Sequence, residues 1–218
     1  MIKERNVMNS FFSTEGPLIS FLDKCGRIIL LSLLWVICCI PLVTVSSSSS
    51  AFYYGITKTI RHERSSSGKE FFRCLKRCFK QGIISSLGFL ILTAVLVVDI
   101  IVWYGKSTKT SLMYMNLCIV FLLGLIALCC YFFAVQSRFK YSIKELLKFS
   151  AFLMFKHLPT TVLIIVIVAV LVYAIVVFPY FLLFLPGLAC MTISYFMENV
   201  FKKYIPKPEE GEEVWYDE

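Results

Sequence analysis

The chain contains a long apolar stretch over residues 158–197 that has no charged side chain. A single helix of that length would be about 60 Å long, whereas the apolar core of a bilayer is about 30 Å thick and is crossed by about 20 residues. Pro179 and the pair Pro186-Gly187 interrupt the stretch, and prolines end or kink helices. The pattern therefore predicts two membrane-spanning helices joined by a turn.

Further apolar runs precede this stretch, and the segment 44–60 decides how many spans they form. That segment is long enough for a helix, but its serines and threonines are polar for lipid. It is either a loop or a span packed among the others, because Ser, Gly and Ala let helices approach closely. We predict an all-α polytopic transmembrane helical bundle of six spans, with five spans as the alternative. The six are expected at about 28–45, 46–62, 82–104, 111–136, 159–178 and 181–201.

The distribution of positive charge favours six spans. With six spans and both termini in the cytoplasm, every Lys and Arg except Lys106 and Lys109 falls on the cytoplasmic side. With five spans, the four cations near the N-terminus move to the outside. Positively charged residues prefer the cytoplasmic side of a membrane, so the six-span arrangement fits better.

Two segments, 68–80 and 142–156, are expected as amphipathic helices on the cytoplasmic membrane surface. In the first, one face at helical spacing holds Phe71, Phe72, Leu75 and Phe79, opposite a basic face. A basic face opposite an aromatic face is typical of an interfacial helix that contacts anionic lipid. Residues 67–73 and 142–148 also resemble each other, which hints at an internal repeat. The basic face consists of Arg73, Lys76, Arg77 and Lys80.

Composition agrees with a membrane protein and excludes a separate soluble domain. The chain has 218 residues, of which 58% are hydrophobic and 17% are charged, and its mean hydropathy is +0.78. Soluble domains usually carry about 25% charged residues. We expect one transmembrane domain over residues 1–205 and an acidic cytoplasmic tail over 206–218. The net charge of +8 then indicates anionic lipid rather than nucleic acid as a partner.

Three motifs resemble the YesL-like family of small bacterial integral membrane proteins, a family known chiefly as a domain of unknown function. They are the segment 40–61 with its Pro41, the segment 70–81, and the segment 138–159. The chain departs from the family where residues 46–50 replace a patch of small Gly and Ala residues. The resemblance implies a bacterial plasma-membrane protein that accompanies carbohydrate uptake. It implies no reaction and no catalytic residues.

Asp99 is the only acidic residue inside a long apolar run. An ionisable group at membrane depth is a functional candidate, but Trp103 nearby also places Asp99 close to the membrane interface. A second candidate is a run of five hydroxyls that either line a polar groove or bond to helix carbonyls. Near the end of the last span, Glu198 and Lys202 have the spacing of an ion pair. The serine run is Ser46, Ser47, Ser48, Ser49 and Ser50.

Cys74 and Cys78 share a helix face, but a structural zinc site needs four ligands, so no metal site is expected. No motif for a catalytic residue or a cofactor occurs. We therefore expect a protein that is not an enzyme. The first hypothesis is an accessory or scaffold component of carbohydrate uptake, with subunits of a sugar ABC transporter or a second copy of itself as partner. The alternative is a small autonomous transporter of a solute or lipid.

Overall fold

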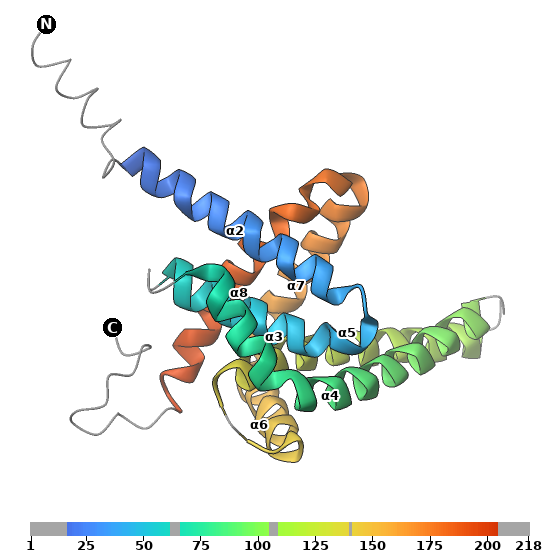
Figure 1. Cartoon of the computed structure of the whole chain (residues 1–218). Helices are drawn as coiled ribbons and strands as arrows, with labels where there is room; N and C mark the ends of the chain where they lie inside the picture. The colour runs from blue at the N-terminus through green and yellow to red at the C-terminus, as the bar shows by residue number, and fades with distance from the viewer. Residues whose placement is uncertain (1–16, 62–65, 105–108, 140, 205–218) are drawn as a thin grey trace, which may run out of the picture.

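The computed structural model describes residues 17–61, 66–104, 109–139 and 141–204, and these residues are helical almost throughout (Figure 1). The predicted all-α class is confirmed, and no strand occurs in the described ranges. The predicted acidic tail, 206–218, lies outside them. The α-helices are α2 (Pro17–Cys39), α3 (Val45–Ile56), α4 (Ser67–Tyr104), α5 (Lys109–Arg138), α6 (Ile143–Lys156), α7 (Leu158–Val177) and α8 (Leu185–Phe201). Shorter helical turns are η1 (Leu42–Thr44), the π-helical η2 (Thr57–Arg61) and η3 (Pro179–Leu183).

Three described helices are long and apolar enough to cross a membrane: α4, α5 from Thr110 onward, and α7. Helix α3 has 12 residues and α8 has 17, which is shorter than the about 20 residues that a span needs. Helix α2 has 23 residues, but its first part carries Asp23, Lys24 and Arg27. The fold is therefore that of a helical membrane protein with three clear candidate spans.

Helix α3 lies in the interior and packs against α2, α4, α5 and α8. Nearly all of its residues from Ser46 to Ile56 are buried. Small side chains make this possible: a Cβ at Gly82 of α4 would lie 1.9 Å from Ser47 Oγ and 2.9 Å from the Ser47 backbone nitrogen. The described part of the predicted span 46–62, which ends at Arg61, is thus a short enclosed helix followed by a π-helical turn, and lipid does not surround the helix.

The predicted surface helix 68–80 is not a separate helix, because it continues without a break into the apolar part of α4. The ribbon changes direction between these two parts (Figure 1). The buried face of residues 68–80 also differs from the expected apolar face. Phe71, Cys74 and Cys78 are buried, whereas Phe72 and Phe79 are exposed. The prediction missed this because the buried thiols count only weakly in a hydrophobic pattern.

The second predicted surface helix corresponds to α6, which is a separate amphipathic helix. Its start is a capping box, in which the Glu145 carboxylate accepts the backbone N–H of Ser142 at 3.0 Å. Leu146, Ser150 and Leu153 form its buried face against the other helices.

Helices α4 and α5 run side by side as a hairpin that projects from the rest of the molecule (Figure 1). Aromatic side chains mark its tip, where Trp103 stacks on Tyr114 at 5.3 Å and Ser111 Oγ donates to the Trp103 carbonyl at 3.1 Å. Only 11% of the apolar window of α4 and 33% of that of α5 is buried. The hairpin therefore offers a long apolar surface to its surroundings.

Helices α7 and α8 meet at the predicted proline turn, which is η3. Gly187 at the start of α8 packs closely on α2, since a Cβ there would lie 2.3 Å from Ile28 Cγ2. Further along α8, Glu198 forms a buried ion pair with Arg138 of α5. This corrects the expectation that Glu198 pairs with Lys202, a choice that helical spacing alone suggested.

Candidate functional site

A buried polar junction connects α3, α4 and α5. The hydroxyls of Ser46 and Ser50 both donate to Gln136 Oε1, at 3.1 Å and 2.8 Å. The backbone N–H of Ser46 donates to Ser86 Oγ of α4 at 2.8 Å. All four residues are at least 96% buried. We call Ser46, Ser50, Ser86 and Gln136 the polar junction.

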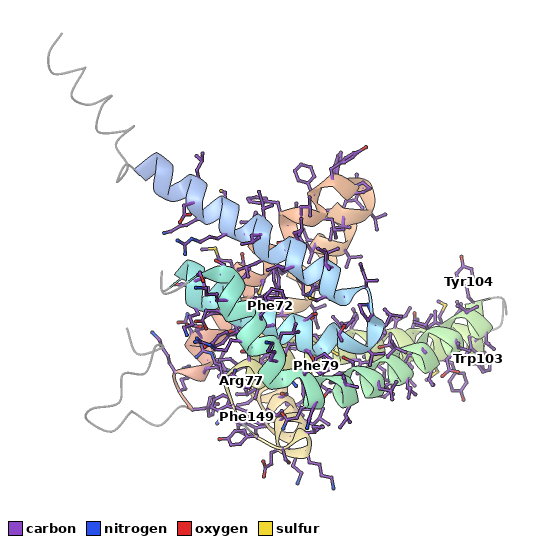
Figure 2. The ribbon with its side chains drawn as sticks, viewed as in Figure 1. Phe72, Arg77, Phe79, Trp103, Tyr104 and Phe149 are labelled. Carbon is purple, nitrogen blue, oxygen red and sulfur yellow. The ribbon has the colours of Figure 1, made fainter. Side chains whose placement is uncertain are left out.

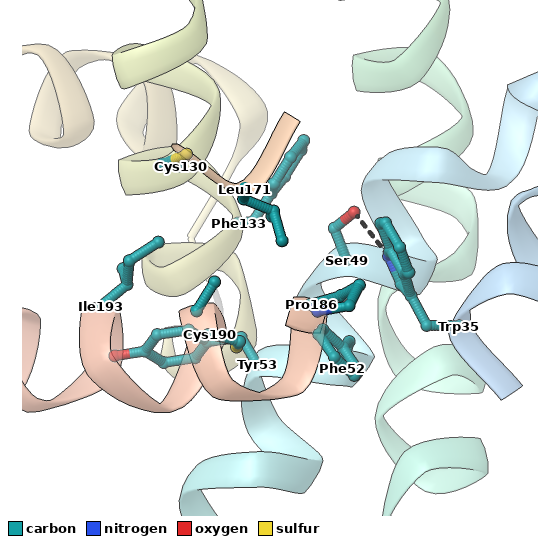
Figure 3. Close-up of a pocket in the computed structure, with 11 residues that line it drawn as sticks. Trp35, Ser49, Phe52, Tyr53, Cys130, Phe133, Leu171, Pro186, Cys190 and Ile193 are labelled. Atoms are coloured by element: carbon teal, nitrogen blue, oxygen red, sulfur yellow. Dashed lines mark hydrogen bonds between the residues drawn. The ribbon is translucent and has the colours of Figure 1, made fainter. Parts of the chain in front are cut away.

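The other serines of the run point to different neighbours. Ser47 Oγ donates to the carbonyl of Phe79 at 3.5 Å. Ser49 Oγ accepts from Trp35 Nε1 of α2 at 3.2 Å, beside an aromatic cavity of about 180 Å³ (Figure 3). Ser48 is fully buried. Four of the five serines therefore bind α3 to α2, α4 and α5, and the run does not line one open groove.

Two cavities adjoin the polar junction. The apolar cavity, of about 580 Å³, lies between α3, α4 and α5, and Ser46 and Ser86 are among the few polar residues of its lining. The basic cavity, of about 430 Å³, has Gln136 in its lining. The junction thus contributes two residues to the lining of the apolar cavity and one to that of the basic cavity. The remaining lining of the basic cavity is Lys76, Arg77, Cys78, Lys80, Gln81 and Phe139.

Two thiols and a guanidinium connect the basic cavity to the interior. Cys74 Sγ and Cys78 Sγ are 3.9 Å apart, and Cys78 Sγ lies 3.6 Å from the Gln136 carbonyl oxygen. Arg77 donates to the carbonyl of Ser137 and lies 5.3 Å from the centre of the Tyr54 ring. A hydrogen bond from the Cys74 thiol, helped by the positive charge of Arg77, lowers the pKa of Cys78.

A buried carboxylate that the sequence did not single out lies at the start of α4. Glu70 is 2% exposed, and its oxygens accept from Lys58 Nζ at 3.1 Å and from Arg73 Nη1 at 3.0 Å. Lys58 also donates to Tyr54 Oη at 3.2 Å. The Glu70 and Arg73 spacing of three residues is a sequence signal for this ion pair, but the contact with Lys58 depends on the turn after α3.

The structure does not bring Asp99 to the polar junction. Asp99 is half-buried near the tip of the hairpin, and it lies about 20 Å along α4 from Ser86 at 1.5 Å per residue. Its carboxylate forms no hydrogen bond or ion pair with another described residue. Of the predicted basic face, Arg73 pairs with Glu70, whereas Lys76, Arg77 and Lys80 surround the basic cavity.

No group of three or more metal-ligating side chains occurs in the part of the chain that the structure describes. All nine cysteines are free, and no histidine or carboxylate within the described ranges joins the Cys74–Cys78 pair in a ligand set.

Helices with the length and apolarity of α4, α5 and α7 define a helical membrane protein. A family model with the description "Protein of unknown function, DUF624" matches residues 28–100, which include the polar helix α3 and the basic start of α4. This stretch of the chain is similar to that family, and the YesL-like resemblance is consistent with the match. No curated protein and no solved structure matches the chain.

Proposed function

We propose that the chain is a non-enzymatic accessory or scaffold component of a larger membrane assembly. The observation that carries this proposal is the α4–α5 hairpin, which projects from the bundle and exposes most of its apolar surface. Within the bundle, by contrast, the polar groups of α3 are bonded to neighbouring helices. A closed interior combined with an extended apolar surface suits a protein that packs against another membrane protein.

The proposed partner is a transporter subunit for carbohydrate uptake, or a second copy of the chain. The carbohydrate connection rests on the family resemblance alone. The location that we propose is the bacterial plasma membrane, with six spans and both termini in the cytoplasm, or five spans as the alternative. The exposed cations Lys76 and Lys80 support a cytoplasmic position for the start of α4, because such residues prefer that side.

A second candidate function is the handling of a lipid by the chain itself. The apolar cavity supports it, since its volume of about 580 Å³ and its largely apolar lining suit an acyl chain. A polar solute is a weaker candidate, because the serines of α3 are buried and Asp99 lies far from them.

Crosslinking in native membranes tests the scaffold proposal. A photoreactive amino acid at Val98, an exposed position of the hairpin, should capture a permease or ATPase subunit. The same amino acid at Val172, an equally exposed position on α7, is the matched control and should capture much less of that subunit. Adducts with lipid alone at both positions would contradict the scaffold proposal and favour the lipid-handling alternative.

A further inference from the structure

The basic cavity gathers three cationic side chains from one turn and a half of α4. Lys76, Arg77 and Lys80 line it together with two amides, Gln81 and Gln136. No acidic side chain is part of the lining, and none of the three cations has a carboxylate partner among the described residues. The charge of this cavity is therefore not neutralised by the described part of the protein.

One residue of the lining, Gln136, also has an unused hydrogen-bond donor. Gln136 is 2% exposed, and its Oε1 accepts from Ser46 and Ser50, while its Nε2 has no partner among the described residues. A buried donor without a partner is costly, and such groups often mark the place of a ligand. Together with the cations, this amide provides donors from two different helices.

The position of the cavity along α4 corresponds to the headgroup region of a bilayer. The distance from Lys80 to Trp103 along the helix is about 35 Å, slightly more than the about 30 Å of an apolar bilayer core. Trp103 and Tyr104 lie at the tip of the hairpin, and Phe72, Arg77 and Phe79 lie toward the other end of α4 (Figure 2). Exposed aromatic residues at both ends are typical of the two membrane interfaces.

We propose that the basic cavity binds a phosphate group, carried by an anionic phospholipid or present as a free phosphate compound. Nη2 of Arg77 already donates to the Ser137 carbonyl, which leaves the other N–H groups of the guanidinium for phosphate oxygens, and Lys76 and Lys80 add positive charge. A zwitterionic headgroup fits less well, because the described lining holds no carboxylate for its ammonium group. This proposal does not depend on the proposed scaffold function.

The test compares lipid retention by the full chain and by two double variants of equal charge. The cavity variant is Lys76→Gln with Lys80→Gln, and the control is Lys144→Gln with Lys148→Gln on α6, where both lysines are exposed. Arg77 stays unchanged, because it also contacts the Ser137 carbonyl and the Tyr54 ring. Each protein is purified from vesicles of phosphatidylglycerol and phosphatidylcholine, and its bound phospholipid is counted by native mass spectrometry.

We expect the unchanged protein and the α6 control to retain phosphatidylglycerol, and the cavity variant to bind it roughly tenfold more weakly. A further variant, Lys76→Arg with Lys80→Arg, should retain it, since the charge is kept. Thermal unfolding in detergent establishes that all variants are folded. The proposal would be overturned if the cavity variant and the α6 control retained equal amounts of phosphatidylglycerol and also bound free phosphate equally.

A competition experiment distinguishes the two sources of phosphate. Inorganic phosphate and glycerol 3-phosphate are titrated against protein that holds phosphatidylglycerol. If neither compound displaces the lipid, the ligand is the phospholipid. If either compound binds at millimolar concentration and the cavity variant loses this binding, the ligand is a free phosphate compound. Absence of binding by both lipid and free phosphate would overturn the proposal.

Discussion

The guanidinium of Arg138 donates to the carboxylate of Glu198, 60 residues later in the chain, and thereby connects α5 to α8. Both side chains are nearly completely buried, at 4% and 3% exposure, and the guanidinium also lies 5.5 Å from the centre of the Phe201 ring. A buried pair of this kind is costly to break, because the remaining charge has no water around it.

Replacing one member of this pair is therefore expected to destabilise the protein strongly. Glu198→Gln should lower the free energy of unfolding by about 3 kcal/mol, measured by denaturation in detergent. The double substitution Arg138→Met with Glu198→Met removes both charges and should recover most of that loss. A double variant as unstable as Glu198→Gln would show that the pair does not act through its buried charges.

A second prediction concerns the close contact between α3 and α4. Gly82→Ala forces a methyl group against Ser47 Oγ and backbone, and should cost about 2 kcal/mol of stability. The matched control is Gly88→Ala, six residues further along the same helix, where nothing lies within 4 Å of the added Cβ. The control should be neutral or slightly stabilising, because Ala favours helix more than Gly. Equal melting temperatures for both variants would contradict the packing of Ser47 on Gly82.

The position of the α2–α3 turn distinguishes six spans from five. Ile40 is 76% exposed there, so Ile40→Cys in a background without the native cysteines provides an accessible thiol. A reagent that does not cross membranes should label it from outside the cell if six spans are present. Tyr104→Cys, at the exposed tip of the hairpin, lies outside in both arrangements and is the positive control. Labelling of Tyr104→Cys without Ile40→Cys would favour five spans.

The thiol of Cys78 is expected to react at a lower pH than an ordinary cysteine. The hydrogen bond from Cys74 and the charge of Arg77 favour the thiolate, and this lowers the pKa of Cys78. Alkylation at Cys78, followed by site-specific mass spectrometry, should therefore reach half its maximum rate below about 8.5, the value for a free cysteine. Cys74→Ala removes the donor and should move the midpoint upward. Cys74→Ser keeps a donor and should move it less. An unchanged midpoint in Cys74→Ala would contradict this assignment.

The apolar pattern was sufficient to predict the helical class and the long helices, because spans are local in sequence. The turn between α7 and α8 was also predictable from Pro179 and Pro186. The main error in the predicted helix boundaries is at residue 81, where a surface helix was expected to end before a span. Nothing in the local sequence interrupts α4 there, and the helix continues. A change from a basic to an apolar pattern marks a change of environment, and a helix can continue across it.

The partners of the polar residues could not be predicted, since they depend on distant helices. Ser46 and Ser50 are 90 and 86 residues from Gln136 in sequence, and no periodic pattern connects them. Glu70 belongs to the segment that was predicted as a helix on the membrane surface. The turn after α3 brings Lys58 to the Glu70 carboxylate, which is buried. The small residues of α3 indicated that other helices could approach it closely. Which helices do so depends on how the whole bundle packs.

The enclosed position of α3 has a consequence for how the protein is made. Helix α3 leaves the ribosome before α4 and α5, yet the partners of Ser46 and Ser50 belong to α5 and the contact surface at Gly82 belongs to α4. Until those helices are inserted, Ser46, Ser47 and Ser50 lack the partners that replace water, and lipid is a poor environment for them. We therefore expect α3 to stay in an aqueous or chaperoned state until α5 is made, and truncation before Gln136 should expose this helix to proteolysis.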